Sequence, residues 1–225
     1  MAMGFLFKNL ANSIQIDENY KNVSLKQKIV SNAYWTVDTL GYWWVADVTA
    51  PSAMGLVAFK SNARISAFGV YDNGDGTFNH QFVTPYIGGQ SPPTVTFYVF
   101  GEPSGTASGM GLLVRNAANE VVFNSSDKPM RVTDVVTSMS TTTNSIPIPS
   151  GRDYAACIAN PGKTRTISTL SGNRVRSDTQ ISARNSGTSI ETSVMNMSSA
   201  AVPAPSNMNG YTGTPMALVI DVTGY

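Results

Sequence analysis

Short apolar and β-branched runs, separated by turn residues, recur along the whole chain. Typical runs lie at residues 5–7, 14–16, 56–59, 94–100 and 216–222. Each is short enough for a β-strand, and Gly, Pro, Asn and Asp clusters bound them. No amphipathic helix longer than two turns is predicted, and the segment 191–199 is at best a short one. The pattern therefore predicts an all-β fold.

Two pairs of neighbouring runs are predicted to form β-hairpins, and these two hairpins share one sequence pattern. Gly4–Asp17 aligns without a gap to Gly111–Asn124, so that equivalent residues lie 107 positions apart. In each copy two short apolar runs flank a turn with two asparagines, a residue that tolerates positive φ. Identical residues along this alignment are Gly4/Gly111, Leu6/Leu113, Asn9/Asn116, Ala11/Ala118, Asn12/Asn119 and Lys21/Lys128.

The two copies divide the chain almost in half. Each half opens on its hairpin and closes on a long apolar strand, at 94–101 and at 216–222. A segment rich in Gly, Ser and Pro, residues 101–109, has the composition of a linker. We therefore expect two tandem β-sandwich-like domains, residues 1–103 and 104–225, related by internal duplication.

Composition and charge narrow the class of protein. Apolar residues make up 42% of the 225 residues, enough for packed cores, but charged residues only 13%, about half the usual ~25%. Ser, Thr, Asn and Gln must then supply the polar surface, as in many rigid extracellular or virion β-proteins. The net charge of +1 argues against electrostatic capture of nucleic acid or membrane. The apolar stretch near Met1 is too short for membrane insertion.

The residues for catalysis are sparse. His80 is the single histidine and Cys157 the single cysteine, so a histidine and cysteine metal site is not available. Cys157 lies in an apolar run and is expected to be buried, which suits a reducing compartment such as the bacterial cytoplasm. The close acids Asp72 and Asp75 belong to a predicted hairpin turn. We expect no catalytic residue, no metal and no cofactor.

Aromatic residues gather in one segment of the first half. All three tryptophans, Trp35, Trp43 and Trp44, lie within ten residues, with Tyr42 beside them. Strand alternation would place Trp43 and Trp44 on opposite faces of a sheet. Three interpretations stay open: an assembly interface, a buried core, or a platform for glycan stacking. These four residues are the candidate interface or glycan contacts.

A basic cluster lies in the second half, between Lys163 and Arg184. It fits either solvated strand faces and turns, or a site for an anionic glycan or phosphate. Arg165, Arg174 and Arg176 are the candidate anion contacts.

The repeated element is an opening Gly-apolar-Leu, a turn with a basic residue and Asn, a hairpin, and then Asp or Asn. It resembles small β-domains of tail-tip, tail-fibre and other minor virion proteins of tailed bacteriophages. Gly101 after Val99-Phe100, and Gly224-Tyr225, are similar to the endings of those domains. The resemblance covers about a third of the chain and leaves out the Trp-rich and Arg-rich segments.

The resemblance implies a non-enzymatic structural component of the virion, in the tail tip, baseplate or fibre, that is assembled in the host bacterial cytoplasm. It also implies other tail proteins as partners and a homo-oligomer of closed, often threefold, symmetry. A contribution to host attachment, through a cell-surface glycan or protein, belongs to the same expectation. The alternatives are a carbohydrate-binding adhesin and a capsid decoration protein.

Overall fold

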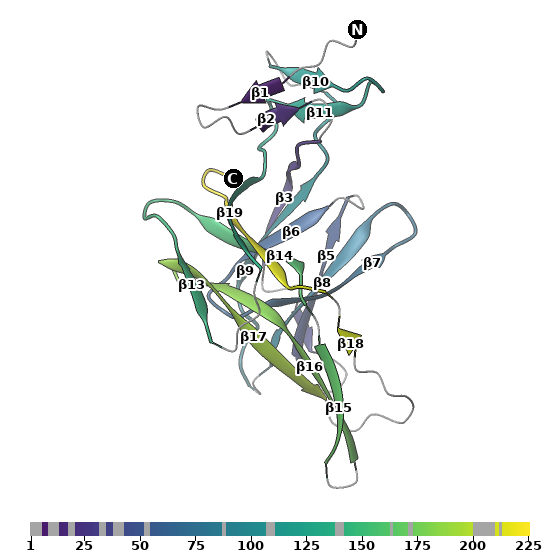
Figure 1. Cartoon of the computed structure of the whole chain (residues 1–225), viewed down its shortest axis with the longest axis vertical. Helices are drawn as coiled ribbons and strands as arrows, with labels where there is room; N and C mark the ends of the chain where they lie inside the picture. The colour runs from purple at the N-terminus through teal and green to yellow at the C-terminus, as the bar shows by residue number, and fades with distance from the viewer. Residues whose placement is uncertain are drawn as a thin grey trace.

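The chain is all-β, as the sequence predicts. The computed structural model describes residues 6–8, 14–17, 21–31, 35–37, 43–51, 55–86, 89–106, 111–137, 142–162, 164–170, 173–199, 210–211 and 213–225. These residues form antiparallel strands, turns and loops, with no helix among them (Figure 1).

Three larger sheets and two hairpins contain all the described strands. The six-stranded sheet runs in the order β12 (Arg131–Val136), β19 (Met216–Asp221), β14 (Tyr154–Asn160), β6 (Leu56–Lys60), β9 (Val95–Gly101) and β3 (Ser24–Ser31). The five-stranded sheet runs β13 (Asn144–Pro147), β17 (Ser189–Ser199), β16 (Asn173–Asn185), β15 (Thr164–Leu170) and β18 (Gly210–Tyr211). The four-stranded sheet runs β4 (Trp35–Val37), β5 (Trp43–Ala50), β8 (Phe78–Pro85) and β7 (Ser66–Asp72).

The expectation of a short helix at 191–199 is wrong, because this segment belongs to β17. It pairs with β16 along its length and with β13 at its start. The hairpin ladder with β16 and the more distant pairing with β13 override the weak β-propensity of its Ser, Asn and Met residues.

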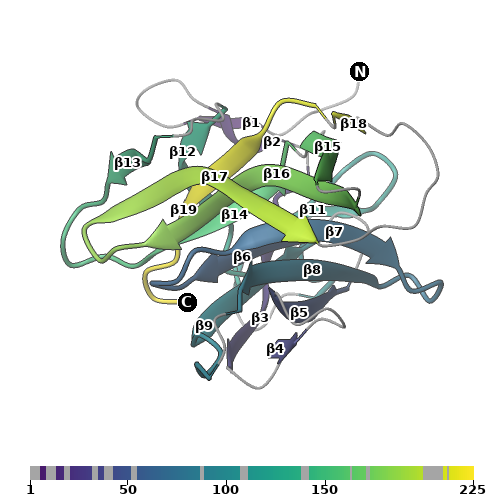
Figure 2. The ribbon, with the colours of Figure 1, turned by 90° about the horizontal axis from the view of Figure 1, so that it is seen from below.

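Strands from both halves of the chain pair directly with each other. In the six-stranded sheet, Phe59 of β6 pairs with Ala156 of β14. Beside it, Ile65 and Ala183 exchange two backbone hydrogen bonds of 2.9 and 2.8 Å. This bridge places the β7–β8 and β16–β17 hairpins next to each other (Figure 2). The contacts therefore cross the boundary that the sequence predicts at 103/104.

The main hydrophobic core also draws on both halves. It lies on one face of the six-stranded sheet, against the two other large sheets, and its largest side chains are fully buried. Members include Phe59, Phe82 and Phe97 from the first half, and Tyr154, Ile181, Ile190 and Val219 from the second. Removing either half would expose the apolar surface of the other.

The two edges of the six-stranded sheet are hydrogen-bonded to each other at one end. Ser24 of the edge strand β3 forms a bridge with Pro129, which leads into the opposite edge strand β12. Leu25 N donates to Lys128 O, and Met130 N donates to Val23 O, each at 2.8 Å. A second buried cluster, on the other face of the sheet, packs against these closing residues. It comprises Ala58, Tyr98, Phe100, Ala155, Cys157, Ile220 and Val222.

The two predicted hairpins have the same strand register. One consists of β1 (Leu6–Lys8) and β2 (Ile14–Asp17), the other of β10 (Leu113–Arg115) and β11 (Val121–Asn124). Every pair in the first hairpin has its counterpart 107 positions later, and the register shifts at the same place in both. Both hairpins gather at the end of the molecule that lies opposite the β15–β16 hairpin (Figure 1).

The turn of the second hairpin uses asparagine as expected. Asn119 has a φ of 65°, a left-handed conformation that asparagine tolerates better than most residues. Asn116 Oδ1 accepts a 2.9 Å hydrogen bond from Glu120 N and so closes the turn.

The shared core predicts that the halves do not fold separately. We expect residues 1–103 and 104–225, expressed alone, to lack a cooperative thermal transition, because each exposes its part of the core. Calorimetry of the full chain should show one transition. A cooperative melt of either half, within a few degrees of the full chain, would contradict this prediction.

Candidate functional site

Two hollows lie at the junction of β6 and β14. The apolar hollow, about 320 Å³, lies where β6 begins and β14 ends, and the β7–β8 hairpin borders it. The polar hollow, about 510 Å³, lies where β6 ends and β14 begins, and the turn between β16 and β17 borders it. The polar hollow is lined by Lys28, Val30, Lys60, Ser61, Asn62, Thr94, Thr96, Tyr98, Asp153, Asn185, Ser186 and Gly187.

Two lysines and one aspartate carry the charge of the polar hollow. Lys60 Nζ lies 2.6 Å from Asp153 Oδ1, but both side chains are more than a third exposed, so solvent weakens this ion pair. Lys28 Nζ donates a 2.9 Å hydrogen bond to Tyr225 O and lies 5.5 Å from the centre of the Tyr98 ring. The side chains lining the hollow therefore carry one net positive charge.

Hydroxyl and amide groups make up most of the remaining lining. Burial raises the pKa of the Tyr98 phenol, and the charge of Asp153 raises it further, so the phenol stays protonated. Asn185 fixes the bordering turn: its Oδ1 accepts from Gly187 N at 2.7 Å, and its Nδ2 donates to Tyr154 O at 2.8 Å. Gly187 has a φ of 95°, which side chains rarely allow. This side of the hollow is thus held in place by its own hydrogen bonds.

The apolar hollow contains one histidine and one thiol. Burial lowers the pKa of His80, against a backbone hydrogen bond with Gly55 that acts in the opposite direction, so the imidazole is neutral at pH 7. Burial raises the pKa of the Cys157 thiol to about 12, so the thiol is uncharged and a poor nucleophile. No carboxylate lines this hollow beside His80.

The described residues contain neither a metal-binding cluster nor a membrane-spanning helix. Among them, no three His, Cys, Asp or Glu side chains gather as a metal site would require. The same part of the chain contains no helix long and apolar enough to cross a bilayer.

The aromatic segment is split between the faces of the four-stranded sheet, as alternation predicts. Trp44 packs towards the main core and meets the Tyr86 ring edge-on, with centroids 5.1 Å apart. Trp43 points to the other face, where it packs against Val83 and Met195. Both are partly exposed. Trp35 is 5% exposed in the main core, so a glycan cannot reach it in the single chain. Tyr42 lies outside the described residues.

The candidate arginines lie on the β15–β16 hairpin. Arg165 of β15 pairs with Asp178, while Arg174 and Arg176 of β16 pair with Thr169 and Ile167. The structure describes the backbone of these residues but not their side chains. Anion binding by this hairpin stays a prediction.

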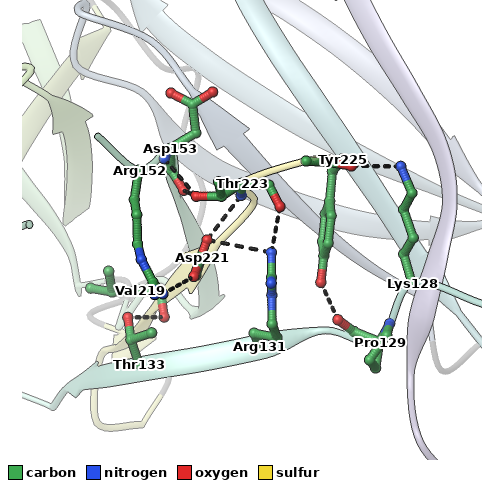
Figure 3. Close-up of polar contacts among 11 residues, drawn as sticks. Lys128, Pro129, Arg131, Thr133, Arg152, Asp153, Val219, Asp221, Thr223 and Tyr225 are labelled. Carbon is green, nitrogen blue, oxygen red and sulfur yellow. Dashed lines mark hydrogen bonds and ion pairs between the residues drawn. The ribbon is translucent and has the colours of Figure 1, made fainter. Parts of the chain in front are cut away.

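A polar network anchors residues 221–225 (Figure 3). The buried Asp221 carboxylate lies 2.9 Å from Arg152 Nη1 and 3.4 Å from Arg131 Nη2, and it accepts a 2.9 Å hydrogen bond from Thr223 N. Arg131 also lies over the Tyr225 ring, 4.8 Å from its centre. The Tyr225 hydroxyl donates to Pro129 O, next to the closure of the sheet.

The partners of Asp221 keep it ionised. Burial acts to raise its pKa, but the hydrogen bonds from Thr223, the charge of Arg131 and the hydrogen bond from Arg152 outweigh burial, so the pKa is lowered. Since the carboxylate is fully engaged by this chain's own residues, the network is a structural clasp. The sequence shows it only as scattered charges, because its members come from three separate segments.

The comparisons with known proteins do not identify a relative. No protein-family model, curated protein sequence or solved structure matches this chain. Its function must therefore be inferred from its own residues.

The clasp predicts a specific acid sensitivity. We expect Asp221→Asn to lower the free energy of unfolding at pH 7 by about 2–3 kcal/mol, since it leaves two arginines without their buried partner. Because the folded-state pKa is lowered, this contribution is present above the unfolded value near 3.8 and lost as pH falls through the folded pKa. Denaturant unfolding of wild type and variant should therefore converge as pH falls through the folded-state pKa of Asp221.

Asp153→Asn is the matched control, because the exposed pair it removes contributes at most about 1 kcal/mol. Equal losses for the two variants at pH 7 would contradict the assignment of the clasp.

Proposed function

We propose that this protein is a non-enzymatic structural component of a tailed-phage virion, in the tail tip, baseplate or fibre. The observation that carries the proposal is the pair of hairpins with identical register, β1–β2 and β10–β11, because they contain the residues that resemble virion β-domains. The hydroxyl-rich, weakly charged, all-β chain agrees with this role.

We also propose that the halves are duplicated β-sandwich-like units that have come to share one core. The strand that follows the hairpin in each half supports this. The pairing of β3 with β9 shifts register between Leu25 and Gln27, and the pairing of β12 with β19 shifts between Val132 and Asp134, 107 positions later. The strand order supports it as well, since β3-β9-β6 in the first half corresponds to β12-β19-β14 in the second.

Assembly into a homo-oligomer, with a trimer favoured, belongs to the same proposal. Apolar side chains on the outer strand β12 support it, because Val132 and Val135 are 43% and 47% exposed. An edge strand with exposed valines can pair with or pack on another chain. Assembly in the host cytoplasm suits a protein whose single thiol is free and buried.

A carbohydrate-binding adhesin is the second candidate function, and the polar hollow is the observation that favours it. The two functions are compatible, because a virion component can also bind the host surface. A capsid decoration protein would have the same fold and differ only in its place on the particle.

The position in the particle tests the main proposal. Immunogold electron microscopy of particles from the source lysate, with antibody against the purified chain, should place label at the tail end. Label on the head would replace the tail assignment by capsid decoration. Absence of label from every particle would overturn the virion proposal and favour a free lectin.

The aromatic segment provides a test of assembly. We expect Trp43→Ala to reduce self-association or binding to a tail partner in sedimentation velocity, while the monomer still melts cooperatively, because the ring is only half-buried. Trp35→Ala is the contrasting variant, since truncating a core tryptophan costs about 3–5 kcal/mol. Loss of the cooperative melt in Trp43→Ala would mean that the ring stabilises the folded monomer and is not an assembly contact.

A further inference from the structure

The lysines of the polar hollow reach it from opposite sides of one strand. On β9, Tyr98 pairs with Lys28 of β3, and Thr96 pairs with Lys60 of β6. Residues at alternate positions of a strand share a face, so the phenol, the hydroxyl and both amines lie on the same face of the sheet. Two cationic groups therefore flank a strip of hydroxyl groups.

Asn62 and the turn at Asn185–Gly187 complete the border of the hollow. The hollow, at about 510 Å³, is wide enough for one or two sugar rings. Its donors and acceptors are hydroxyl, amide and amine groups, which suit a polyhydroxylated ligand. Tyr98 is 2% exposed and offers no flat ring face to a base, so stacking of single-stranded nucleic acid has no platform here.

We propose that the polar hollow binds a saccharide that carries a carboxylate. Lys28 and Lys60 hold the carboxylate, while Thr96, Asn62 and the Asn185–Gly187 turn contact the sugar hydroxyls. The excess of two lysines over one aspartate favours an anionic ligand. The Lys60–Asp153 pair does not prevent this, because both side chains are exposed and the ligand can join or replace Asp153 as partner of Lys60.

This site deepens the adhesin candidate and does not depend on where the protein lies in a particle. Sequence order conceals it, since Lys28, Lys60, Thr96, Asp153 and Asn185 come from five strands or their ends. None of Trp35, Trp43 and Trp44 lines the hollow.

Titration of the full-length protein with simple probes tests the site. Glucuronate, glucose and acetate are followed by two-dimensional NMR of the labelled protein, which gives both affinity and location. We expect glucuronate to shift resonances around the hollow and to bind at least tenfold more tightly than glucose or acetate. Lys28→Ala and Lys60→Ala should each weaken glucuronate at least fivefold, and Thr96→Val should weaken glucuronate but not acetate.

Arg115→Ala is the matched control, because it removes one positive charge from β10, whose residues do not line the hollow. Thermal melts verify that each variant is folded, and any lysine variant that unfolds is replaced by its glutamine counterpart. Glucuronate binding no tighter than acetate, or binding that the lysine variants leave unchanged, would overturn the proposal, as would no binding. Tail labelling without glucuronate binding would reject this site and leave the virion proposal standing.

Discussion

The pairing of β6 with β14 is the constraint on which the rest of the structure depends. It joins three strands from each half into one sheet, and both faces of that sheet are then buried by clusters that mix the halves. The Ser24–Pro129 bridge completes the arrangement, because it ties the two outer strands at one end. The two hollows are a direct result, since they occupy the two ends of the same strand junction.

Local sequence patterns predicted those elements whose structure is set locally. The apolar runs at 94–100 and 216–222 became β9 and β19, and the Asn-rich turn placed Asn119 at positive φ. Segment 191–199 was mispredicted because its strand state depends on β16 and β13, which pair with it from either side. The joining of the halves had no local signal either, since it rests on contacts between residues far apart in the sequence, such as Phe59 and Ala156.

The candidate sites also divide into those set by local sequence and those that depend on contacts between distant segments. Alternation correctly separated Trp43 from Trp44, because it is a property of one strand. The polar hollow and the clasp around Asp221 could not be predicted from the sequence, because each combines side chains that only the sheet order brings together. Sequence patterns thus single out residues that are close along the chain, whereas the best-organised polar groups come from segments far apart in it.

The order of strands in the six-stranded sheet has a consequence for synthesis on the ribosome. The strand β19 inserts between β12 and β14, both of which are made at least 50 residues earlier. Until β19 emerges, β12 lacks its neighbour, β14 lacks one of its two, and the Asp221 clasp cannot form. The sheet is therefore completed only after β19 has been made. In a nascent chain the edges of β12 and β14 that face β19 would therefore stay unpaired until residues 216–221 had been added.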